Sequence, residues 1–179
     1  MELVRLNQIQ RDSGIDRGRD WRSFMLESVI QGFRDYCVID SLRTHSANTA
    51  LLLAEAQTTV KSNIDGVPQS CGIVHYDLNP SNVLADGNRV TGVIDWESTQ
   101  GGDPAFDLVT LLYYRYSSKP ARQELWEYLL KSSSLPAIRV YLAHVIVRQV
   151  DWSIRHHTRD EVERYLRRSR EIVHNSSER

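Results

Sequence analysis

The sequence has few cysteines and no long apolar segment. Among its 179 residues, only Cys37 and Cys71 carry thiols, and they form no CxxC pair. A disulfide framework is therefore not expected, and the composition is typical of a reducing compartment, with two buried thiols or a single Cys37–Cys71 bridge as the alternatives. The N-terminal residues lack the apolar stretch of a signal peptide, and no apolar run is long enough to cross a bilayer. We expect a soluble, cytoplasmic protein without a membrane partner.

The sequence also lacks an excess of charge of either sign. Lys and Arg number 22 and Asp and Glu number 23, which gives a formal net charge of −1. This balance provides no general attraction to nucleic acid, so no nucleic-acid partner is expected. The motifs G-x-S-x-G, H-E-x-x-H and G-K-[ST] are absent. The sequence therefore carries none of the common signatures of α/β-hydrolases, zincins or Walker-type nucleotide-binding proteins. The shares of hydrophobic residues (41%) and charged residues (25%) are ordinary for one soluble domain.

Apolar residues at helical spacing surround a short segment that favours strands. The segment contains three apolar runs and a turn at 86–88, so the predicted fold class is mainly α with a small β-hairpin insert (α+β). A frayed tail is expected at 175–179. The predicted strands cover 72–74, 82–85 and 89–94, and the predicted helices cover 3–9, 21–33, 47–60, 106–116, a segment from Pro120, 136–152 and a segment from Thr158.

Polar residues are concentrated in this insert. Asp77 follows the first predicted strand, and Asn82 lies where the chain enters the next one. Because the loop closes on itself and the hairpin returns antiparallel, we expect Asp77, Asn82 and Asp95 to face one cavity. Such oxygen ligands suit Mg²⁺, and a carboxylate can accept the proton of an attacking hydroxyl, as phosphoryl transfer requires. Taken alone, Asp77 is better explained as an N-cap or turn aspartate, and Asn82 is also typical of a turn.

The pattern H-x-D-x-x-x-x-N at 75–82, followed by I-D-W-E at 94–97, resembles the catalytic segment of the aminoglycoside phosphotransferase/choline kinase-like family, which shares the protein-kinase fold. The resemblance continues through G-D-P-x-x-D-L at 102–108. It implies a protein-kinase-like C-terminal lobe over residues 1–174, with the catalytic segment at 73–108.

The resemblance implies a catalytic base at Asp77 and Mg²⁺ and nucleotide ligands at Asn82 and Asp95. The implied donor is ATP or GTP, and the implied acceptor is a hydroxyl of a small molecule, with antibiotics among the candidates. The sequence leaves the acceptor open, and the later carboxylates are either amine contacts or ordinary surface residues: Asp151, Asp160, Glu161 and Glu163.

Four further residues receive supporting roles from the resemblance. His75 would brace the catalytic loop, and Asp107 would cap the backbone amides of that loop. Leu84 and Ile94 would line the lower wall of an adenine pocket. The chain departs from the antibiotic kinases at Tyr76, where those enzymes often have glycine.

The sequence lacks the signals of a nucleotide-covering lobe. None of its nine glycines forms G-x-G-x-x-G, and Lys61 is the only lysine before the motif at 75–82. We expect the chain to begin where the C-terminal lobe begins, with the N-terminal lobe absent. Three hypotheses stay open: a catalytic-lobe fragment of a small-molecule kinase, an inactive lobe that acts as a binding module with a partner or second copy over the inter-lobe face, or a carboxylate–Mg²⁺ hydrolase.

Overall fold

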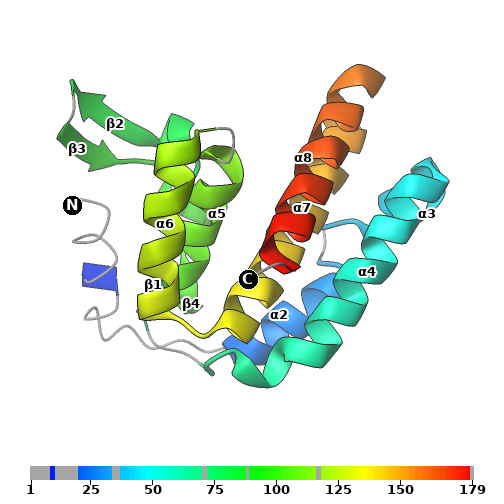
Figure 1. The fold of residues 1–179 in the computed structure, drawn as a ribbon, viewed down its shortest axis with the longest axis horizontal. Helices are drawn as coiled ribbons and strands as arrows, with labels where there is room; N and C mark the ends of the chain where they lie inside the picture. The colour runs from blue at the N-terminus through cyan, green and yellow to red at the C-terminus, as the bar shows by residue number, and fades with distance from the viewer. Residues whose placement is uncertain are drawn as a thin grey trace.

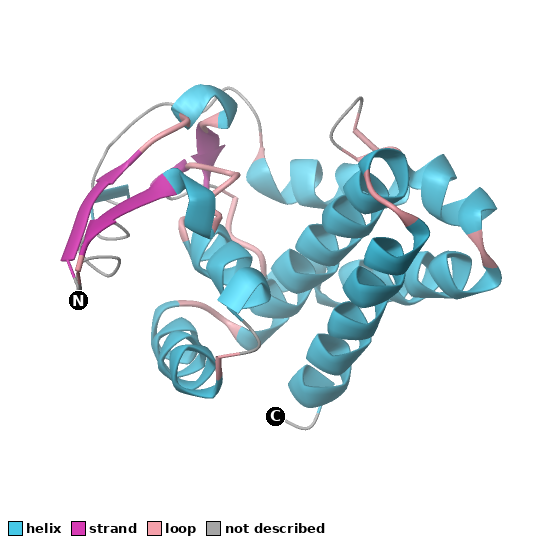
Figure 2. Ribbon diagram, turned by 90° about the horizontal axis from the view of Figure 1, so that it is seen from above, coloured by secondary structure: helices cyan, strands magenta, loops and turns pink. Residues whose placement is uncertain are grey.

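The structure, a computed structural model, describes residues 9–10, 20–33, 37–69, 72–87, 89–115 and 118–177. It is mainly helical with two small antiparallel sheets, which confirms the predicted fold class (Figures 1 and 2). The long helices in these ranges are α2 (Trp21–Ile30), α3 (Ile39–His45), α4 (Ala47–Asn63), α5 (Ala105–Arg115), α6 (Lys119–Ser132), α7 (Leu135–His156) and α8 (Arg159–Ser177).

Several helices begin at residues that satisfy the free amides of a first turn. The Asp20 side chain accepts hydrogen bonds from the Arg22 and Ser23 amides at the start of α2. Ser46 and Thr49 form a reciprocal capping box on α4. Helices α6 and α7 both carry proline in the first turn, where its missing amide hydrogen leaves no bond unmade.

Two pairs of short strands flank the polar loop. β1 (Gly72–Val74) pairs antiparallel with β4 (Gln100–Gly102), and β2 (Val83–Asp86) pairs antiparallel with β3 (Arg89–Val93). Gly87 supplies the positive φ of 56° at the hairpin turn. The β2–β3 hairpin lies at one edge of the molecule, away from α7 and α8 (Figure 1).

Helix α7 is the centre of the helical part and packs against α2, α3, α4, α5 and α8 (Figure 1). Between residues 137 and 151, only Arg139 is not buried. A helix that is apolar on nearly all sides is stable only when other elements surround it. Within the described ranges, no helix combines the length and apolar character needed to cross a membrane.

The structure adds two elements that the sequence pattern did not predict. α3 buries only Ile39 and Leu42, which is too little periodicity to indicate a helix, and β4 is Gln-Gly-Gly, which has no strand preference. Helix α8 continues to Ser177, inside the segment expected to fray. Most of the helix predicted at 3–9, Cys71 and the last turn residue at 88 lie outside the described residues.

We expect Gly102→Ala to lower the free energy of unfolding by about 1–3 kcal/mol, because a side chain there overpacks the core. A Cβ at this position would lie 2.5 Å from the Trp21 ring, which is held by Phe24, Phe106 and Tyr141. Urea denaturation measures the loss.

Gly92→Ala is the matched control, because its Cβ would meet Leu84 at an ordinary 3.6 Å. Equal stability of the two variants would show that the indole has room to move.

Candidate active site

The loop after β1 is anchored by a buried carboxylate. Asp107, in the first turn of α5, accepts hydrogen bonds from the backbone amides of His75 (2.8 Å) and Tyr76 (3.0 Å). Gln10 donates a third bond at 2.6 Å. The start of a helix also favours a negative charge. The structure therefore places Asp107 on the loop amides, the position that the family resemblance implies.

Burial raises the pKa of Asp107 to about 6, while the bonds from His75, Gln10 and Tyr76 act in the opposite direction. The cause is the loss of water around the charged form, which buried donors replace only in part. The folded protein therefore holds the Asp107 proton more tightly than the unfolded chain does.

His75 joins this loop to the segment after β3. Its Nε2 lies 2.8 Å from the carbonyl oxygen of Ile94, and its ring packs against Trp96 with the centroids 4.6 Å apart. The Ile94 amide donates to the carbonyl of Asn82 at 3.0 Å. Both ends of the polar loop are thus bonded to Ile94, the residue directly before Asp95.

Asp77 and Asn82 lie together, as their spacing predicts. The side-chain nitrogen of Asn82, Nδ2, donates to the backbone carbonyl of Asp77 at 2.9 Å. The same nitrogen lies 3.5 Å from the Asp77 carboxylate. Asn79 donates to the same carboxylate oxygen at 3.1 Å and accepts from the Ser81 amide at 2.8 Å. These bonds close the loop through the 3-10 turn η3 (Pro80–Asn82) and hold Asp77 beside Asn82.

Asp95 lies two residues after the end of β3, and it is exposed. Within the described part of the chain, its carboxylate has no hydrogen bond or ion pair. Its φ of 65° and that of Tyr76 at 72° are the positive values among the non-glycine residues described. Backbone conformations of this kind cost energy and cluster at functional sites.

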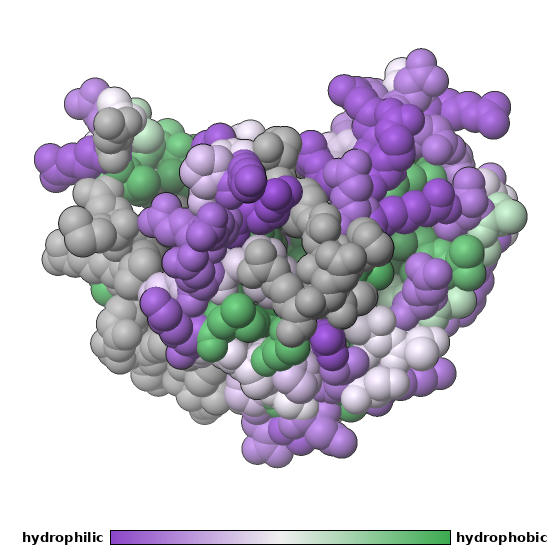
Figure 3. All heavy atoms as spheres, in the orientation of Figure 1, coloured by the Kyte–Doolittle hydropathy of each residue, from purple (hydrophilic) through white to green (hydrophobic). Residues whose placement is uncertain are grey.

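An apolar surface lies next to these polar groups. Leu84 on β2 and Ile94 after β3 are 46% and 45% exposed, and Trp96 is exposed beside them. Figure 3 shows hydrophobic colour on the hairpin side of the molecule. The pair predicted to line an adenine pocket is therefore accessible, and that role stays a prediction.

Sequence reasoning missed two residues of α7 that contact the loop. Tyr76 stacks on Phe106 at 5.3 Å, and its hydroxyl lies 2.9 Å from Nε2 of His144. Arg148 donates to the Tyr76 carbonyl at 2.6 Å and lies 3.6 Å from the Asp77 carboxylate. The available signal was a pair of polar residues four apart, at 144 and 148, in the mostly apolar stretch 140–148 of the helix.

One candidate amine contact is corrected by the structure. Asp151 is buried, and it accepts hydrogen bonds from the Val38 amide (3.0 Å) and the Ser41 hydroxyl (2.6 Å). Arg155 completes its bonding. Asp151 therefore caps α3, a helix that the sequence pattern did not predict, and is neither a surface residue nor open to a ligand.

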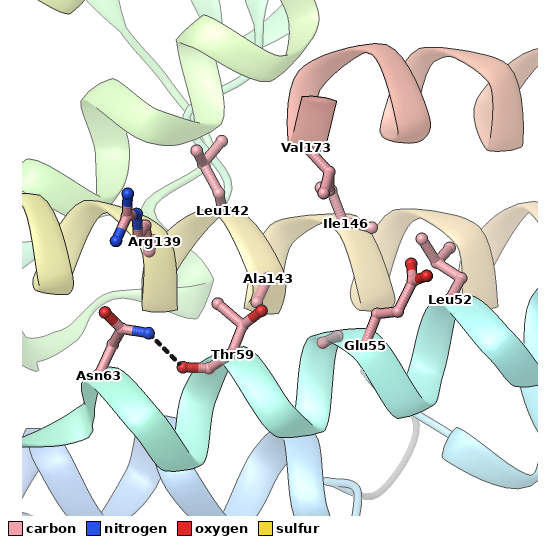
Figure 4. A pocket seen from close by; sticks show the side chains of 10 residues that line it. Leu52, Glu55, Thr59, Asn63, Arg139, Leu142, Ala143, Ile146 and Val173 are labelled. Carbon is pink, nitrogen blue, oxygen red and sulfur yellow. Dashed lines mark hydrogen bonds between the residues drawn. The ribbon is translucent and has the colours of Figure 1, made fainter. Parts of the chain in front are cut away.

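A cavity of about 300 Å³ opens between α4 and α7 (Figure 4). Glu55 and Thr59 face Arg139 and Ile146 across it, and Val173 of α8 closes one side. None of the predicted site residues lines this cavity.

The chain matches the model of the phosphotransferase enzyme family over residues 3–141. The chain belongs to this family. Among curated relatives of this family member, hygromycin-B 4-O-kinase of Escherichia coli is 26% identical over 145 residues, which cover 79% of this chain and 41% of the relative. The uncharacterized protein YcbJ of Bacillus subtilis (strain 168) is 39% identical over 62 residues, or 34% of this chain and 20% of the relative.

Two solved structures share the fold of this chain. Aminoglycoside phosphotransferase APH(4)-Ia, as a thermostable mutant in ternary complex with ADP and hygromycin B, gives a TM-score of 0.66 at 22% identity, over 87% of this chain and 52% of that one. A choline/ethanolamine kinase family protein from Mesorhizobium loti gives 0.63 at 20% identity, over 94% and 61%. The chain thus spans about half the length of the relatives that it matches over most of its own length.

We expect Asp107→Asn to lower the free energy of unfolding by about 1–3 kcal/mol, because one of two buried amides loses its acceptor. The effect depends on pH. Since the folded-state pKa of Asp107 (about 6) exceeds the usual 3.8, the folded protein holds an extra proton between these values. The stability from this group therefore falls as pH rises from about 4 to about 6 and is constant above that range.

Urea denaturation of both proteins at the two ends of this range measures the difference. The advantage of the wild type over Asp107→Asn shrinks as pH rises, and Asp86→Asn on the exposed hairpin is the control. If the difference in the free energy of unfolding between the wild type and Asp107→Asn grows as pH rises, the raised pKa of Asp107 is contradicted.

Proposed function

We propose that this chain carries the catalytic segment of an ATP-dependent phosphotransferase that transfers the γ-phosphoryl group to a hydroxyl of a small molecule. The main support is the closed loop in which the Asn82 amide bonds to Asp77, while Ile94, bonded to both ends of the loop, leads into Asp95. These contacts support a site in which Asp77, Asn82 and Asp95 act together. GTP is the alternative donor.

The donor set around Asn82 and Asp95 fits Mg²⁺. Nδ2 of Asn82 donates to the Asp77 carbonyl. Oδ1 of Asn82 has no hydrogen-bond partner among the described residues. The Asp95 carboxylate is likewise unpaired within them and exposed. No cluster of three or more His, Cys, Asp or Glu side chains suited to a metal occurs in the described ranges. A few oxygen ligands completed by water and phosphates are typical of Mg²⁺.

In the proposed reaction, Asp77 accepts the proton of the acceptor hydroxyl as its oxygen bonds to the γ-phosphorus. The bond between that phosphorus and the β-γ bridging oxygen breaks, and ADP leaves. Mg²⁺, when bound, neutralises charge on the phosphates. Asn79 and Asn82 hold one carboxylate oxygen of Asp77, so the base is oriented before the acceptor arrives.

Two relatives support a class of acceptor. Hygromycin-B 4-O-kinase is named for hygromycin B, and the APH(4)-Ia structure is a complex with hygromycin B. We propose an aminoglycoside-like acceptor on this basis. Leu84 and Ile94 are proposed to contact the adenine ring, because they form accessible apolar surface beside the loop.

Binding of Mn²⁺, a paramagnetic substitute for Mg²⁺, tests the metal site without any transfer reaction. We expect Mn²⁺ to broaden the amide NMR signals of Asn82 and Asp95 in this chain. Asp95→Ala should abolish the effect, whereas Asp86→Asn, which removes another exposed carboxylate of the hairpin, should leave it intact. Broadening that survives in Asp95→Ala would remove Asp95 as a ligand.

Phosphate transfer from ATP to hygromycin B, followed by ³¹P NMR, tests the base. Asp77→Asn should lower kcat by about 10²–10⁴-fold with little change in KM, because it removes a proton acceptor but keeps the shape of the side chain. Unchanged turnover would eliminate Asp77 as the base. Metal binding without transfer by the wild type would favour the binding-module hypothesis.

A further inference from the structure

Arg148 is buried beneath the proposed base. Its side chain is 7% exposed and its guanidinium contacts the loop at three points. Nη1 donates to the Tyr76 carbonyl at 2.6 Å, Nη2 lies 3.6 Å from Oδ1 of Asp77, and Cζ lies 4.6 Å above the Tyr76 ring. Nη2 is buried without a hydrogen-bond partner.

The ion pair between Arg148 and Asp77 is asymmetric. The arginine is buried, while the Asp77 side chain is 40% exposed. A buried guanidinium is costly, and a carboxylate compensates that cost only where it is held in place. Arg148 is therefore shielded from water where it faces Asp77. The Asp77 carboxylate stays partly open to solvent, and an acceptor must reach it from that open side.

Arg148 also controls the backbone that leads to Asp77. Tyr76 has a φ of 72°, a conformation that costs about 1–2 kcal/mol in a residue with a side chain. Asp107 holds the amide side of Tyr76, and Arg148 holds the carbonyl side. Because that carbonyl belongs to the peptide bond preceding Asp77, the arginine restrains the direction in which the Asp77 side chain leaves the loop.

His144 supports this arrangement without adding a second positive charge. Burial, and secondarily the charge of Arg148, lower the pKa of His144 to about 3. The imidazole is therefore neutral at ordinary pH and bonds to the Tyr76 hydroxyl at 2.9 Å. Tyr76 is thus held between a neutral histidine and the guanidinium.

We propose that Arg148 is a positioning residue, which sets the orientation of the Asp77 carboxylate through Nη2 and of its backbone through Nη1. Asn79 and Asn82 contact the other carboxylate oxygen, Oδ2, so both oxygens of Asp77 are restrained by neighbouring side chains. The catalytic meaning of this geometry rests on the proposed function, whereas the geometry itself does not.

NMR of the chain with ¹⁵N-labelled arginine tests the contact without any transfer reaction. Resonances are assigned with Arg148→Lys. We expect Asp77→Asn to shift the Nη2–H signals of Arg148 and to leave the Nη1–H signals, whose acceptor is the Tyr76 carbonyl, in place. Asp86→Asn is the matched control and should move neither. If the chemical shifts of the Nη2–H signals do not change in Asp77→Asn, the proposal is wrong and Arg148 is a purely structural residue.

Kinetics separate a positioning role from a structural one. In Arg148→Lys and Arg148→Met, kcat should fall at least about tenfold with the KM for ATP unchanged, because small displacements of a catalytic group are costly. Arg139→Met, on the same helix but lining the distant cavity, should keep both values. Should Arg148→Met not fold, the lysine variant and the NMR shift still decide.

The two proposals fail in different ways. An Nη2 shift in a chain that transfers no phosphate contradicts the proposed function alone. Transfer by the wild type with kcat unchanged in Arg148→Lys contradicts the positioning role alone.

Discussion

The buried carboxylate of Asp107 is the interaction on which the site depends. It satisfies two consecutive backbone amides, those of His75 and Tyr76, at a point where the chain enters a positive φ and has no sheet or helix partner for them. Buried amides without acceptors are costly, so the loop adopts this course only where an anion lies beneath it. Because Asp107 belongs to the first turn of α5, the loop is tied to the helical core.

A second set of contacts acts on the other face of the same peptide. Arg148 bonds to the Tyr76 carbonyl, while Phe106 and His144 pack against the Tyr76 ring. The large residue where the antibiotic kinases often carry glycine is therefore integrated into the core. It gives α7 a contact with the loop that a glycine cannot make.

The sequence predicted the local parts of this arrangement well. The hairpin and the closeness of Asp77 and Asn82 follow from short spacing, because a loop of this length must close on itself. Asp107 also bonds to the loop amides that the family pattern implies. The chemical roles of Asp77, Asn82 and Asp95 stay predictions.

The parts that were missed depend on contacts between distant segments. Arg148 and His144 have no local signature of function, since a polar residue in an apolar helix indicates burial without naming its partner. Asp151 was misread for a related reason: its partners belong to α3, a helix too short to be recognised from its own pattern. Two of the three residues of β4 are glycines, and the segment is a strand only because β1 pairs with it.

The bonds that shape the loop join residues far apart in the chain. His75 and Asp107 are separated by 32 positions, and Tyr76 and Arg148 by 72. Closing such long segments costs chain entropy that is recovered only when the helices have packed. The loop is therefore held in its final shape only where α5 and α7 are packed in the core. A partly folded chain that contains every residue of the site would still hold the Asp77 carboxylate in no defined direction.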